Sequence, residues 1–63
     1  MKEWVITYED EEAFDELMKV GEMVLVSGII NLVIIKSYWS SDAILKIKGV
    51  IDCEEARTGY ILH

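Results

Sequence analysis

Residues 23–36 read MVLVSGIINLVIIK, an apolar stretch interrupted by a serine-glycine pair and by one asparagine. The density of valine and isoleucine is typical of β-strands. Ser27-Gly28 offers a turn or bulge, and Asn31 offers a second turn site. The stretch therefore predicts a β-hairpin with strands of about five residues. Because it is short and interrupted, it does not read as a membrane span.

A strand and a helix are predicted before this hairpin. Residues 4–8, WVITY, are β-branched or aromatic and predict the first strand. The acidic run 9–12 suits a helix N-terminus, with Asp10 as the best cap. Apolar side chains then recur at helical spacing, at Phe14, Leu17 and Met18. Gly21 is expected to close this helix as the residue after its last turn.

A second helix and a last strand are predicted after the hairpin. Residues 37–42, SYWSSD, break the apolar run, and Ser40 or Ser41 is expected to cap a short helix. Gly49 is expected to close that helix, and residues 50–54, VIDCE, read as the last strand.

The resulting order, β-α-β-β-α-β, predicts an α+β fold of the ferredoxin-like kind. Two amphipathic helices would cover one face of a four-stranded antiparallel sheet, in a single domain over residues 1–63. Residues 56–63 would form either a C-terminal tail or an edge strand. The uncovered face, a candidate for a protein partner or a second copy, would carry some of five residues. These are Trp4, Val24, Val26, Leu32 and Ile34.

Composition narrows the classes of function and location. The chain is 52% hydrophobic with a net charge of −6, and its six basic residues are scattered, which disfavours nucleic acid and membrane partners. The single cysteine, Cys53, excludes an intramolecular disulfide and is expected to be a semi-buried structural residue. The N-terminal residues lack a signal-peptide pattern, so a cytoplasmic location is expected.

The sequence contains few of the residue types and motifs that commonly carry catalysis. The one histidine, His63, is the final residue, and no cysteine-pair, phosphate-loop or nucleophile-turn motif is present. The carboxylate pairs Asp15-Glu16 and Glu54-Glu55 are consecutive, so their side chains point apart. We therefore expect a binding protein without enzymatic activity, cofactor or metal.

The chain resembles the propeptide-type inhibitor domains of subtilisin-like serine proteases. Residues 49–55, GVIDCEE, are similar to that family's helix-ending Gly-Val, short strand and acidic exit, and the order of elements matches over nearly the whole chain. One departure is Lys48, which stands where the family usually has proline before Gly-Val.

The resemblance implies an inhibitor or folding chaperone whose sheet face docks on a protease. The tail would lie in the active-site cleft like a substrate, with Tyr60 as anchor and His63 beside the scissile bond. That tail comprises Tyr60, Ile61, Leu62 and His63. Glu54 and Glu55 would meet helix N-termini on the protease, where anions are favoured. Alternatively, residues 60–62 complete the core or an edge strand.

A second hypothesis uses the same fold without a protease. The acidic charge and the surplus of β-branched residues also fit a small adaptor or homo-oligomerising module of bacterial or phage origin. Such a module would hide its open sheet face in a homodimer or against a host protein.

Overall fold

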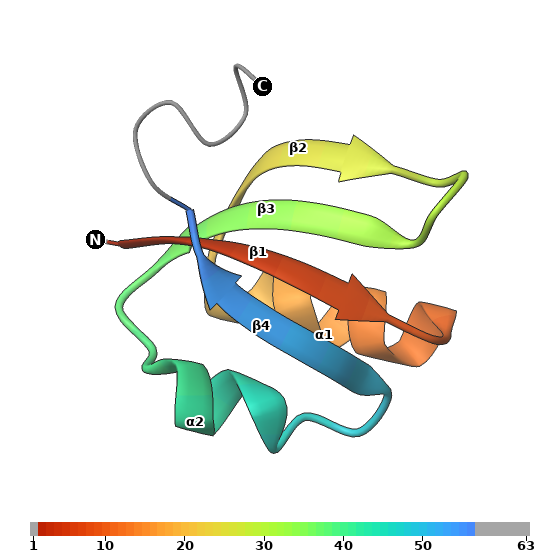
Figure 1. The fold of residues 1–63 in the computed structure, drawn as a ribbon. Helices are drawn as coiled ribbons and strands as arrows, with labels where there is room; N and C mark the ends of the chain where they lie inside the picture. Colours follow the sequence, from red (N-terminus) through yellow and green to blue (C-terminus); the bar gives the residue numbers. More distant parts are fainter. Residues whose placement is uncertain (1, 57–63) are drawn as a thin grey trace.

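The helices and strands follow one another in the order β-α-β-β-α-β (Figure 1). The computed structural model describes residues 2–56. Their bounds are β1 (Lys2–Tyr8), α1 (Glu11–Val20), β2 (Glu22–Ser27), β3 (Leu32–Ser37), α2 (Ser41–Leu45) and β4 (Val50–Glu55). The strands form one antiparallel sheet in the order β2-β3-β1-β4. The predicted ferredoxin-like α+β arrangement is confirmed.

One face of the sheet carries the core. Ile6 lies opposite Val33 on β3 and opposite Cys53 on β4, and paired residues share a face. Alternate residues of β1 are accordingly buried, namely Trp4, Ile6 and Tyr8. Both helices contribute to the same cluster, through Ala13, Leu17 and Ile44. Both helices therefore cover one face of the sheet.

The first helix begins as predicted but ends differently. The carboxylate of Asp10 accepts from the backbone N–H of Ala13 at 3.0 Å, which caps α1. Gly21, expected in the left-handed conformation that closes many helices, is instead extended, with φ at −165°. A Cβ atom at Gly21 would lie 2.6 Å from the carbonyl oxygen of Lys36. Gly21 follows the last turn of α1, as predicted, but in an extended conformation, and the glycine is needed there for close approach to β3.

The second helix is shorter than the glycine pattern predicted. Ser40 caps it, accepting from the N–H of Ala43 at 3.3 Å, and the helix ends at Leu45. Gly49 lies four residues further on, with φ at +94°, in the connection to β4. Its carbonyl accepts from the N–H of Glu9 at 2.8 Å. Gly49 therefore shapes the entry to β4 next to α1 and does not close α2.

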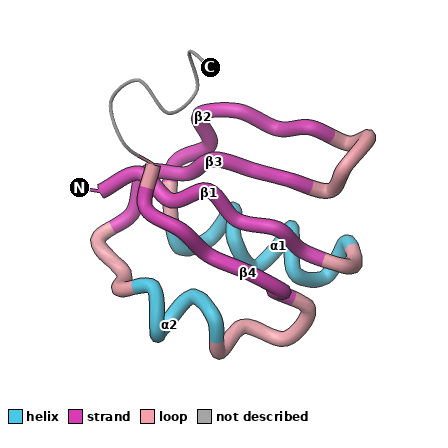
Figure 2. Tube along the Cα trace, in the orientation of Figure 1, coloured by secondary structure: helices cyan, strands magenta, loops and turns pink. Residues whose placement is uncertain are grey.

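The central hairpin is confirmed, but its turn is longer than Ser27-Gly28. Residues 28–31 join β2 to β3 as a loop (Figure 2). Asn31 adopts a left-handed conformation, with φ at 49°, and its carbonyl accepts from the N–H of Tyr8 at 3.1 Å. The turn therefore includes Ile29 and Ile30 and extends from the Ser27-Gly28 site to Asn31, the second turn site that the sequence offered. Ile29 is 96% exposed.

No helix within residues 2–56 has the length and apolar character needed to cross a membrane.

We predict that Gly49→Ala destabilises the fold by about 1–3 kcal/mol, because the left-handed backbone disfavours a side chain. The new Cβ atom would also lie 2.8 Å from Oδ1 of Asp10 and 2.9 Å from Cβ of Ala13. Gly28→Ala is the matched control, because nothing lies within 4 Å of its Cβ position. Urea unfolding of both variants checks this, and equal stabilities would contradict it.

Candidate protein-binding face

The sheet face opposite the helices, here called the open face, can be described in rows across the strands. The middle row contains Leu25, Ile34, Val5 and Glu54. The row towards the β2–β3 turn contains Ser27, Leu32, Thr7 and Asp52. The third row contains Glu22, Lys36 and Glu3. The open face is thus apolar in its middle row over β2, β3 and β1, charged in its third row and acidic along β4.

Ile34 is the centre of the apolar part. It is 3% exposed although it lies on the face away from the helices, and Leu25 and Val5 flank it in register. The accessible apolar surface comes from its neighbours, chiefly Leu25, which is 43% exposed. Both helices described here pack on the other face. The middle row is therefore a rigid apolar strip on which a partner can pack.

Two of the five residues suggested for this face lie on the other face, and a third is the extra residue of a strand irregularity. Trp4 pairs with Ile35 and Val26 pairs with Val33, so both lie on the helix side of the sheet. Val24 is the extra residue in an irregularity between Met23 and Leu25. Leu32 and Ile34 are on the open face as suggested.

The irregularity in β2 explains why sequence reasoning missed Leu25. Strict alternation from Glu22 would put Val24 and Val26 on the open face. The extra residue moves Leu25 and Ser27 there instead. Val5 was missed because Trp4 was suggested for the open face. Trp4, Ile6 and Tyr8 alternate on the core face, which leaves Val5 on the open face.

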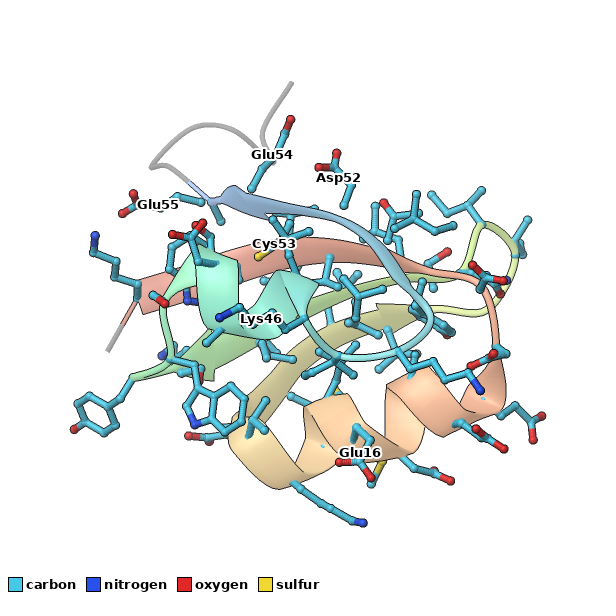
Figure 3. All side chains as sticks on the ribbon, turned by 90° about the horizontal axis from the view of Figure 1, so that it is seen from below. Glu16, Lys46, Asp52, Cys53, Glu54 and Glu55 are labelled. Atoms are coloured by element: carbon cyan, nitrogen blue, oxygen red, sulfur yellow. The ribbon has the colours of Figure 1, made fainter. Side chains whose placement is uncertain are left out.

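The acids of β4 divide between the two faces. Asp52 and Glu54 project from the same side of the strand, and Cys53 points away from them (Figure 3). Glu55 pairs with Trp4 and lies with its carboxylate 3.9 Å from the ammonium group of Lys2. The expected partner-binding pair Glu54-Glu55 is therefore split, and Asp52 joins Glu54 on the open face. The other expected contact residues, Tyr60, Ile61, Leu62 and His63, lie outside the described residues.

Cys53 is buried, at 9% exposure, as the sequence predicted for a structural thiol. Burial, with a further contribution from the carboxylate of Asp52, raises the pKa of the Cys53 thiol from its usual 9.0 to about 11. The thiol is therefore protonated and poorly nucleophilic at neutral pH. Among residues 2–56, no three His, Cys, Asp or Glu side chains are grouped to hold a metal ion.

Comparisons of the chain with protein-family models, curated proteins and solved structures gave no match.

We predict that iodoacetamide alkylates Cys53 about a hundredfold more slowly in the folded chain than in urea at pH 8.

The raised pKa of Cys53 also makes the stability of the fold depend on pH. The unfolded thiol ionises from about pH 9, whereas the folded thiol holds its proton to about pH 11, so this contribution to stability is lost as the pH rises between those values. Equal alkylation rates would contradict the first expectation. A parent chain whose stability falls no more than that of Cys53→Ala between pH 9 and pH 11 would contradict the second.

Proposed function

We propose that this domain is a protein-binding module that docks through the open face, in the manner of propeptide-type inhibitors. The observation that carries the proposal is the apolar row of Leu25, Ile34 and Val5, which ends at Glu54 on β4. An apolar centre with a charged border is the usual anatomy of a protein interface. A flat four-stranded surface fits a folded partner better than a small molecule.

The charge of the border sets the kind of partner. Asp52 and Glu54 are exposed on the same side of β4, at the edge of the apolar strip. Acids at this position favour basic side chains or helix N-termini on the partner and speed its association. Lys36 in the third row has Glu22 and Glu3 on its two sides in register, which leaves the face acidic overall.

The resemblance in residues 49–55 supports a subtilisin-like serine protease as the partner class. In that proposal, surface helices of the protease pack on the open face, and the chain's C-terminal residues reach the catalytic cleft. In the same proposal Glu54 meets a helix N-terminus of the protease, and its position at the border of the apolar row supports this contact. Glu55 points to the other side of β4 and is assigned no contact with the protease.

We expect the purified chain to inhibit a subtilisin-like protease in a peptide-hydrolysis assay, with loss of inhibition after removal of residues 60–63. Thr7→Arg, which places a bulky charge on the open face in the row next to Leu25, Ile34 and Val5, should weaken binding at least tenfold, equivalent to about 1.4 kcal/mol. Met18→Arg is the matched control, because Met18 is exposed on α1, outside the open face, and the change in charge is the same.

Circular dichroism of both variants verifies folding before binding is measured. Absence of inhibition at micromolar concentration, with no complex detected by calorimetry, would refute the protease assignment. Binding that is equally weakened by Thr7→Arg and Met18→Arg would refute docking through the open face.

A further inference from the structure

The two borders of the sheet differ in chemistry, and we propose that β2, the apolar border, pairs with β2 of a second copy of this chain. Among residues 2–56, the strand order places β2 and β4 at the borders (Figure 1). A border strand has backbone N–H and C=O groups without a partner in the sheet, and these groups can pair with another strand. Pairing through β2 is distinct from docking through the open face, because it uses backbone groups at the rim.

The β4 border carries protection against such pairing. Three of its six residues are acids, Asp52, Glu54 and Glu55, and charges on an edge strand disfavour the approach of another strand. In a symmetric β4 pair these acids would be brought close to their equivalents. The carboxylate of Asp52 also accepts from the backbone N–H of Cys53 at 2.9 Å, so one donor of this strand is already satisfied.

The β2 border lacks comparable protection. From Met23 to Asn31 the sequence contains no charged residue, and Val24, Leu25 and Val26 are each 43–49% exposed. Ile29 and Ile30 continue this apolar surface into the turn. Glu22, the one acid of β2, lies opposite Lys36 on β3. An uncharged, apolar strand at a sheet border favours pairing with another strand.

The pattern of β2 is complementary to itself. An antiparallel pair centred between Val24 and Leu25 puts Glu22 opposite Ser27 of the second copy, and Met23 opposite Val26. Glu22 and Ser27 both lie on the open face, and Met23 and Val26 both lie on the helix side, so each pair meets on one face. The two Glu22 side chains then sit about 17 Å apart along the strands, beyond a Debye length of about 8 Å.

Pairing with a second copy would also add to the stability of so small a domain. Chains of about 60 residues bury a limited share of their surface, and oligomerisation is one of the usual supports. The paired form would be a continuous eight-stranded sheet with a two-fold axis perpendicular to it. All four helices would then lie on one side, and both open faces on the other.

Light scattering after size exclusion tests the proposal on the full chain. We expect a mass twice the 7.2 kDa of one chain at high micromolar concentration. Val24→Lys should raise the dissociation constant at least tenfold. Ile51→Lys is the matched control, because Ile51 is the exposed extra residue in the irregularity of β4, as Val24 is in β2. Both changes add one positive charge.

Hydrogen exchange on the unmodified chain gives a second measurement that does not depend on any variant folding. Amides of residues 24–27 should gain protection as the concentration rises, and those of β4 should not. A wild-type chain that stays monomeric at high micromolar concentration would overturn the proposal. So would a dimer that Ile51→Lys weakens as much as Val24→Lys, or one lost in Thr7→Arg and kept in Val24→Lys, which would be a face-to-face dimer.

Discussion

The hydroxyl group of Ser37 joins the end of β3 and the segment that follows it to the end of α1, which is distant in the sequence. It donates to the carbonyl of Val20, the last residue of α1, at 2.6 Å, and accepts from the backbone N–H of Trp39 at 3.0 Å. Ser37 is 2% exposed, so a carbonyl left unpaired there would cost about 1–3 kcal/mol. The same junction brings Gly21 against the backbone of β3. It therefore determines where the chain enters β2.

From that entry point β2 runs along one border of the sheet, and the two borders differ in their side chains. β2 returns beside β3 at one rim, and β4 takes the other rim beside β1. Both border strands contain an irregularity, yet their side chains differ, because β2 carries valine and leucine where β4 carries aspartate and glutamate. Bulges alone therefore do not distinguish the two rims. Charge distinguishes them, and charged side chains on an edge strand disfavour unwanted pairing.

Much of the fold was predictable from local chemistry. The strand over residues 4–8 and the cap at Asp10 depend on neighbours in the sequence, and the structure confirms both. The place of Gly21 at the end of α1 was predicted, but the reason for a glycine there is tertiary, a close approach to the carbonyl of Lys36. The open face was predicted to exist, but Leu25 was missed because the extra residue at Val24 has no local signature. The contacts expected of residues 60–63 stay predictions.

The open face and the β2 rim are compatible because charge is concentrated away from the rim. On each domain the acids Asp52 and Glu54 stand on β4, three strands away from β2. In the paired form the two β4 strands would be separated by seven strand spacings, roughly 34 Å at about 4.8 Å each. That distance exceeds the Debye length of about 8 Å several times, so the like charges of the two β4 strands are largely screened from each other.

The apolar rows of the two open faces would meet at the centre of the wider face, with the β4 acids at both ends. A partner long enough to contact both halves would gain affinity from the linkage itself, since the second contact forms at a high effective concentration.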